Sequence, residues 1–145
     1  MRAFFQRAGL LAYLHFRALL VPSTFGVAAI VEDDDGRVLL VKHTYQPGWL
    51  LPGGGVARGE PPEQALLREL REEVGLVRAA APELVRVHTL RAGWVTNVVA
   101  LFRVRGAEIH FQPNIEIRDA AFYPRDALPN GTPWSVRRRI EEVLG

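Results

Sequence analysis

The chain has 145 residues and contains no cysteine. Without a thiol it can form no disulfide, no thiolate zinc site and no catalytic cysteine. This composition is compatible with the cytoplasm, and we expect a cytoplasmic location. A strong charge of one sign is also missing, because 18 basic residues nearly balance 16 acidic ones. The formal net charge of +2 indicates no dedicated nucleic-acid surface, so no specific nucleic-acid partner is expected.

The N-terminal segment, residues 1–22, lacks any acidic side chain. It combines many large apolar side chains with Arg2, Arg7 and Arg17. Its uninterrupted apolar stretch is too short to span a bilayer. We expect the segment to be helical and to pack on the rest of the chain or on a second protomer, which would make a homodimer. Interfacial membrane contact of residues 1–21 is the less favoured alternative.

The remaining length suits one compact domain, over residues 23–145. With 48% hydrophobic and 23% charged residues, the chain can bury one core but hardly two. Hydrophobic periodicity and turn residues predict several strands, one clear helix and a second helix that begins at Pro133. The strands are expected at 25–31, 37–43, 84–90, 96–105 and 117–123, and the helices at 62–74 and 133–144.

Two hairpins are predicted in this pattern. Asp35 and Gly36 close an acidic loop between the first two strands, which is a hairpin signal. The carboxylates of this loop, which begin at Glu32, are interpreted as solvated charge rather than as a metal site. A second hairpin tip is expected at 91–93. The basic run 137–139 is interpreted as the exposed face of the last helix, not as a nucleic-acid patch.

The helix at 62–74 carries the clearest chemical signal. Its spacing places Glu69, Glu72 and Glu73 on one side, next to an apolar face that packs on a core. Carboxylates so close repel one another unless a cation lies between them. Oxygen ligands suit Mg²⁺ or Mn²⁺. The glycine-rich turn before the helix can offer a carbonyl to a metal or N–H groups to a phosphate, so Gly54 is a substrate-binding candidate.

Residues 54–76 match, at every fixed position, the Nudix box G-x5-E-x7-R-E-U-x-E-E-x-G-U, in which U is a bulky aliphatic residue. The chain therefore resembles the Nudix hydrolase family, strongly over this box and in general layout elsewhere. The resemblance implies an α/β fold, namely a Nudix-type α/β/α sandwich with a mixed β-sheet between helices, over residues 23–145. The fixed positions are Gly54, Glu60, Arg68, Glu69, Leu70, Glu72, Glu73, Gly75 and Leu76.

The resemblance also implies a metal site. In the family the last three glutamates of the box bind divalent cations, so Glu69, Glu72 and Glu73 are the implied ligands. A backbone carbonyl just ahead of the box commonly joins them, and here it would be that of Gly53. Arg68 matches the arginine that steadies the glutamates by hydrogen bonds. The implied cofactor is Mg²⁺ or Mn²⁺.

One more acidic residue is expected from a loop outside the box, because the family typically recruits one there. Glu116 is our choice, since it precedes the strand-like run 117–123, and Glu83, Glu108 and Asp119 are less favoured. Glu60 is a weaker ligand candidate, acting through water. The catalytic candidates are therefore Arg68, Glu69, Glu72 and Glu116.

The implied activity is hydrolysis of a diphosphate linkage in a nucleoside diphosphate joined to another group. An ADP-ribose or ADP-sugar substrate is favoured. The alternatives are a house-cleaning hydrolase of modified nucleoside triphosphates and a Nudix-like module that senses a nucleotide without cutting it. The intact box glutamates argue against the sensing module. Tyr45 and Trp94 are candidates for stacking on a base, although such aromatics more often serve in packing.

Overall fold

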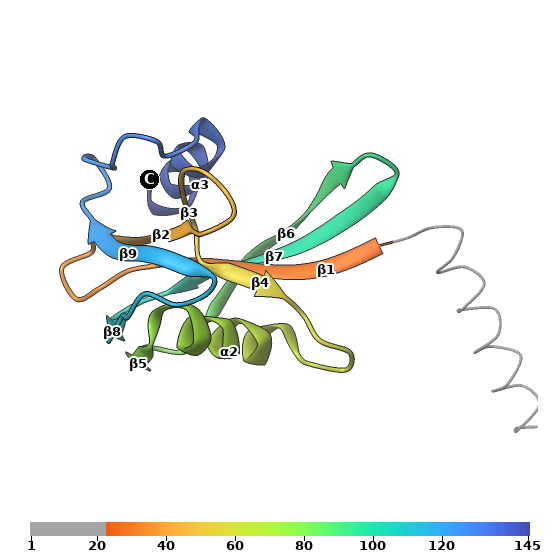
Figure 1. Ribbon diagram of the computed structural model, residues 1–145, viewed down its shortest axis with the longest axis horizontal. Helices are drawn as coiled ribbons and strands as arrows, with labels where there is room; N and C mark the ends of the chain where they lie inside the picture. Colours follow the sequence, from red (N-terminus) through yellow and green to blue (C-terminus); the bar gives the residue numbers. More distant parts are fainter. Residues whose placement is uncertain (1–22) are drawn as a thin grey trace, which may run out of the picture.

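The computed structural model describes residues 23–145, and the N-terminal segment lies outside that part. Strands form the middle of the molecule and two helices flank them (Figure 1). The elements are β1 (Ser23–Val31), β2 (Val38–His43), β3 (Trp49–Leu50), β4 (Gly53–Gly55), α2 (Pro62–Val74), β5 (Leu76–Arg78), β6 (Glu83–Ala92), β7 (Val95–Val104), β8 (Glu108–Ile109), β9 (Ile117–Tyr123) and α3 (Trp134–Leu144).

A four-stranded sheet of order β4-β1-β7-β6 forms the centre. β1 runs parallel to β7 along its whole length and antiparallel to β4. β6 and β7 make the second hairpin that the sequence predicts, with its turn at Gly93 and Trp94. Parallel and antiparallel neighbours share this sheet, so the predicted mixed sheet is confirmed. Two further sheets, β3-β2-β9 and β5-β8, complete the strand layer.

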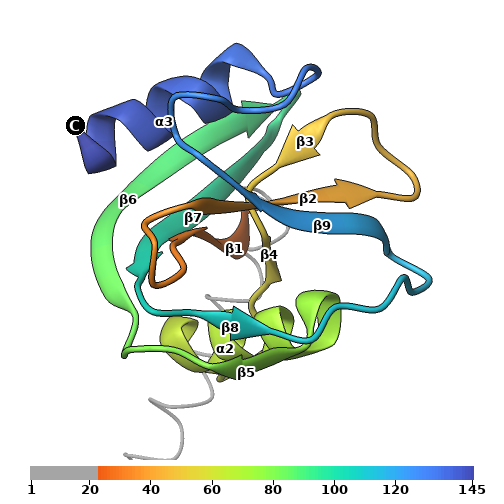
Figure 2. The same cartoon turned by 90° about the vertical axis from the view of Figure 1, so that its left-hand side faces the viewer.

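The two helices cover opposite faces of the central sheet (Figure 2). Because successive side chains of a strand point to opposite faces, β1 contributes to two cores. Val27 and Ala29 pack with the apolar face of α2, whereas Ile30 packs with Val136 and Ile140 of α3. The α/β/α arrangement expected from the sequence is therefore present.

The first predicted hairpin is wrong. β1 and β2 belong to different sheets and share only one isolated bridge, between Glu32 and Val38. β7 pairs with one edge of β1 along its whole length and β4 pairs with Gly26–Ala28 on the other edge, whereas β2 pairs with β3 and β9. The local turn is nevertheless real, since the Asp33 carboxylate accepts the N–H groups of Asp35 and Arg37.

Glu32 also departs from the predicted solvated acidic loop. Only 9% of its surface is exposed, and its carboxylate is held by Arg103 of β7. Nε of Arg103 donates to Oε2 at 2.6 Å and Nη2 donates to Oε1 at 3.2 Å. This two-point ion pair ties the end of β1 to its parallel neighbour. The interpretation as solvated charge holds for Asp34 and Asp35, which are exposed, but not for Asp33, whose side chain is only 10% exposed and pairs with Arg37 at 2.7 Å.

The boundaries of α2 agree with the prediction from the sequence. Pro61 and Pro62 begin the helix, and Gly75 ends it in the left-handed conformation with φ of 66°. Leu66, Leu70 and Val74 are fully buried against the sheet, and each buried side chain of this kind stabilises the fold by about 1.5–3 kcal/mol. The helix is therefore fixed along one face, which leaves the adjacent acidic face in a set position.

Within residues 23–145 no helix is long and apolar enough to cross a membrane. The N-terminal segment lies outside the described residues. Its predicted packing as a helix on the domain or on a second protomer, and the alternative contact of residues 1–21 with a membrane, therefore stay predictions. The boundary between that segment and a domain over 23–145 therefore stays a prediction.

Candidate metal and substrate site

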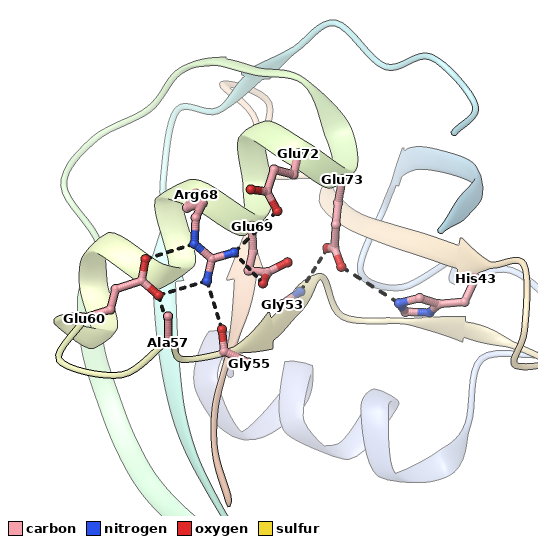
Figure 3. Close-up of polar contacts among 9 residues, drawn as sticks. All are labelled: His43, Gly53, Gly55, Ala57, Glu60, Arg68, Glu69, Glu72 and Glu73. Carbon is pink, nitrogen blue, oxygen red and sulfur yellow. Dashed lines mark hydrogen bonds and ion pairs between the residues drawn. The ribbon is translucent and has the colours of Figure 1, made fainter. Parts of the chain in front are cut away.

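The glycine strand β4 and the helix α2 meet at one corner of the sandwich, where the box residues gather (Figure 3). Glu69 and Glu73 point inward from α2 and are only 9% and 4% exposed. Glu72 lies further out, with 60% of its side chain exposed. Charged groups that are so well covered require partners. The partners found here show how the box is organised.

Gly54 makes room for the carboxylate of Glu69. A β-carbon at Gly54 would stand 2.6 Å from both oxygens of that carboxylate, which is closer than real contacts allow. Because glycine has no β-carbon, β4 can approach α2 this closely. The first glycine of the box and Glu69, the first of the three glutamates predicted to bind metal, are thus linked by one packing contact.

Arg68 joins the two ends of the box. Its guanidinium donates to both oxygens of Glu60 and to Oε1 of Glu69, at 2.9 Å in each case. It also donates to the carbonyl of Gly55 at 3.0 Å and more weakly to Glu72 at 3.4 Å. The hydrogen bonds from Arg68 lower the pKa of Glu60 to about 2. These contacts agree with the steadying role that the sequence implied for Arg68.

Glu73 is the most deeply buried carboxylate of the site. Its Oε2 accepts the N–H of Gly53 at 3.2 Å, and its Oε1 lies 4.0 Å from Nε2 of His43. Burial, assisted by the charges of Glu69 and Glu116, raises the pKa of Glu73 to about 8. Burial also lowers the pKa of His43. Both shifts favour the neutral forms, so the 4.0 Å contact is not a strong ion pair. His43 was not among the site residues predicted from the sequence.

Asn114 attaches the loop that carries Glu116 to the end of α2. Its Nδ2 donates to the carbonyl of Glu73 at 3.1 Å. Its Oδ1 accepts the N–H groups of Glu116 at 3.1 Å and of Ile117 at 2.9 Å. Glu116 is itself exposed, and its charge adds to burial in raising the pKa of Glu69. The structure therefore brings Glu116 to the acidic corner, while Asn114 was missed although Asn is typical of such turns.

The donor set fits a divalent cation by its chemistry, because Glu69, Glu72 and Glu73 offer only oxygen ligands. Among the residues that the structure describes, no three Asp, Glu or His side chains already surround one point. Arg68 and the N–H of Gly53 hold the carboxylates instead. Ligation by all three would require Glu72 to turn toward the two buried carboxylates, and its exposure permits this. The carbonyl of Gly53 as a ligand stays a prediction.

Of the two aromatic candidates, the structure brings only Tyr45 to this corner. Its ring centroid lies 5.1 Å from that of His43. Burial and the charges of Glu116, Glu73 and Glu69 raise its pKa. The ring is 71% exposed and so can meet a ligand. Trp94 is 78% exposed at the tip of the β6–β7 hairpin, which extends away from α2 in Figure 1. A role in substrate binding stays a prediction for both residues.

A cleft of about 370 Å³ adjoins the glycine strand on the face of the sheet toward α3. Thr24, Gly54, Asn97 and Arg139 contribute to its lining, and Oγ1 of Thr24 donates to Oδ1 of Asn97 at 2.9 Å. The reading of 137–139 as exposed is wrong for Arg139, which is half-buried and whose pKa burial lowers. Arg139 is next to the buried Ile140 in the helix and lines the cleft on the sheet. Its position depends on which side of α3 packs on the sheet.

An α/β/α sandwich that sets a glycine strand against a helix of clustered glutamates is the architecture of a nucleotide-hydrolase fold. The comparison with known families agrees with this assignment. The family described as NUDIX domain matches residues 22–143. The chain therefore belongs to the Nudix hydrolase family, whose members generally use divalent metal ions.

Similar proteins include two named RNA pyrophosphohydrolase. The chain is 46% identical over 69 residues to that of Acinetobacter baylyi, a match that covers 48% of this chain and 39% of the relative. It is 54% identical over 50 residues to that of Halorhodospira halophila, covering 34% and 28%. The matches thus span well under half of these relatives. The crystal structure of a MutT NUDIX hydrolase from Burkholderia pseudomallei shares 27% identity, with a TM-score of 0.71 and coverage of 83% and 98%.

Proposed function

We propose that this protein hydrolyses a phosphoanhydride bond of a nucleotide with the help of a divalent cation. The observation that carries the proposal is the corner where β4 and α2 meet. There Glu69 and Glu73 are buried side by side, Arg68 holds the first of them, and Gly54 leaves space for it. A binding module would gain nothing from two buried carboxylates in a phosphate site, because they repel an anionic ligand.

Mg²⁺ or Mn²⁺ would be held by Glu69, Glu72 and Glu73, with the carbonyl of Gly53 as a further ligand. When bound, the cation neutralises phosphate charge and acidifies a water. Neighbouring protein groups hold the ligand side chains in place. Arg68 keeps Glu69 in place, and the N–H of Gly53 does the same for Glu73. Both buried glutamates are thereby preorganised, which is how electrostatic stabilisation of a transition state is obtained.

Glu116 is the proposed general base. It is exposed, it lies close enough to influence Glu69 and Glu73, and Asn114 anchors its loop to α2. In the proposed reaction water attacks a phosphorus atom and gives its proton to the Glu116 carboxylate. The bond from that phosphorus to the bridging oxygen breaks, and the second phosphate leaves with the bridging oxygen. Tyr45 stands at the entrance and is proposed to contact the substrate.

The substrate favoured by the sequence, a nucleoside diphosphate joined to another group, such as ADP-ribose or an ADP-sugar, remains one candidate. The cleft beside Gly54, with the polar Asn97 and the cation Arg139, is proposed to take part of such a nucleotide. A second candidate is a triphosphate group, including that at an RNA 5′ end. It is supported by the names of the relatives that share 46% and 54% identity over the matched regions. A cytoplasmic location remains part of this proposal.

Product analysis tests the proposal. The full chain would be incubated with Mg²⁺ and ADP-ribose, an ADP-sugar, nucleoside triphosphates, or RNA with a 5′-triphosphate. Release of AMP from an ADP-linked substrate supports the first candidate. Release of pyrophosphate from a triphosphate supports the second. Tight binding of these compounds without cleavage of any of them would refute the enzyme and favour a nucleotide sensor.

A further inference from the structure

An apolar groove lies between the first turn of α2 and the strands β1 and β6. Its volume is about 270 Å³. We call it the α2–β6 groove. It is on the α2 side of the central sheet and shares no residue with the carboxylate site. Its walls and floor are formed by Phe25, Pro61, Pro62, Leu84, Val87 and Phe102.

Several apolar side chains in the walls of this groove are well exposed to solvent. Phe25 is 38% exposed, Leu84 57% and Val87 55%. These are three of the ten large hydrophobic residues exposed in the described part of the chain, and they surround one groove. Covering exposed apolar side chains such as these with an apolar partner is favourable, because it removes their surface from water. We therefore expect an apolar partner to cover the groove.

We infer that the N-terminal segment of the same chain occupies the α2–β6 groove. The segment joins the described part at Ser23, and two residues later Phe25 forms a wall of the groove. In Figure 1 the start of β1 and the loop that enters α2 lie on the same side of the molecule. Three extended residues span about 10 Å. Leu19 and Leu20 are therefore within reach of the groove.

Composition and tether both favour this occupant over a second copy. The segment supplies a series of large apolar residues, among them Leu10, Leu14 and Phe16. A direct covalent link gives it an effective concentration in the millimolar range. A separate molecule would reach such a value only at very high protein concentration. The N-terminal segment is thus favoured over a second copy of the chain as the occupant of the groove.

Charge complementarity adds a second, independent reason. The segment carries Arg2, Arg7 and Arg17 and no acid. The rim of the groove carries Glu63, in the first turn of α2. None of the ion pairs among residues 23–145 uses Glu63. An arginine of the docked segment would give this carboxylate a partner.

Thiol trapping in the full chain tests the inference, and the natural absence of cysteine gives a clean background. Val87→Cys would be paired in turn with Leu10→Cys, Leu14→Cys and Leu19→Cys, and joined with a short bismaleimide. The matched control is Val77→Cys on β5, which is 60% exposed and outside the groove. We expect an intramolecular link to Val87→Cys in at least one pair, formed about tenfold faster than any link to Val77→Cys.

Circular dichroism would establish that each variant is folded. Equal rates at Val87→Cys and Val77→Cys would overturn the inference. So would links that form only between molecules and accelerate with protein concentration, because they would show a second copy in the groove. Glu63→Arg should slow the link, whereas Glu141→Arg, on α3, should not. The outcome does not depend on catalysis and so is separate from the proposed function.

Discussion

Replacing Gly54 by alanine should damage the site far more than the same change one residue later. The new β-carbon at Gly54 would meet the carboxylate of Glu69, with both oxygens at 2.6 Å. At Gly55 a β-carbon would meet nothing within 4 Å. Neither residue has a positive φ, so alanine strains the backbone at neither position. Gly55→Ala is therefore a matched control.

The expected losses of stability and turnover in Gly54→Ala depend on the contacts that Glu69 loses. Its side chain would have to move away from that β-carbon, and we expect this movement to break its hydrogen bond to Arg68. A lost hydrogen bond of a buried carboxylate and some crowding together cost about 1–2 kcal/mol. For a domain of this size that lowers Tm by roughly 3–8 °C. Displacing a metal ligand by about 1 Å should reduce turnover by about a hundredfold.

Thermal unfolding and steady-state turnover on the cleaved substrate of the panel would be measured for both variants. Gly54→Ala should lose stability and activity, whereas Gly55→Ala should stay near the wild type. If the two variants behave alike, the packing of Glu69 on Gly54 does not organise the site. Loss of stability with normal turnover would show that Glu69 is not held there for catalysis.

Two further predictions concern neighbouring groups. Asn114→Ala should lower kcat about tenfold with little change in Tm, because the loop of Glu116 loses both its bond to α2 and the two bonds that shape its own turn. Asn114→Asp, which keeps the acceptor for those two N–H groups but not the bond to α2, should restore only part of kcat, and equal kcat in all three proteins would contradict this. Glu60 has a pKa of about 2 in the folded chain against 4.5 ordinarily, so its stabilisation is complete above about pH 4.5 and is lost as pH falls toward 2. The difference in Tm between wild type and Glu60→Gln should shrink over that range, and a constant difference would count against the Arg68 contact.

Local signals explain which parts of the fold could be predicted from sequence. The helix boundaries at Pro62 and Val74 depend on prolines, a terminal glycine and leucine spacing, all of which act within a few residues. The β6–β7 hairpin is likewise a contact between neighbours in the chain. The hairpin expected at Gly36 is absent because strand pairing is decided by competing partners from distant segments: β7 and β4 pair with β1, and β3 and β9 pair with β2.

In the site, too, features set by local sequence could be predicted, and features set by packing of distant segments could not. Family spacing identifies the box, and the structure supplies the reason for it in the contacts of Arg68 and Gly54. Residues from distant segments were beyond sequence reasoning, because their placement depends on packing. Asn114 reaches the end of α2 through a loop, and Arg139 meets the sheet only because α3 docks with that side inward. Glu116 could be chosen by position alone, and its role stays a prediction.

Glu69, Glu72 and Glu73 are proposed to bind a divalent cation in phosphoanhydride hydrolysis. The most direct test of this proposal is the turnover of Glu72→Gln at limiting Mg²⁺, on whichever nucleotide the wild type cleaves. Glu72 is exposed, so the variant should keep the wild-type Tm. The proposal predicts a loss of about a hundredfold in turnover, the scale expected when electrostatic stabilisation of a transition state is removed. Near-normal turnover by a folded Glu72→Gln variant would contradict it.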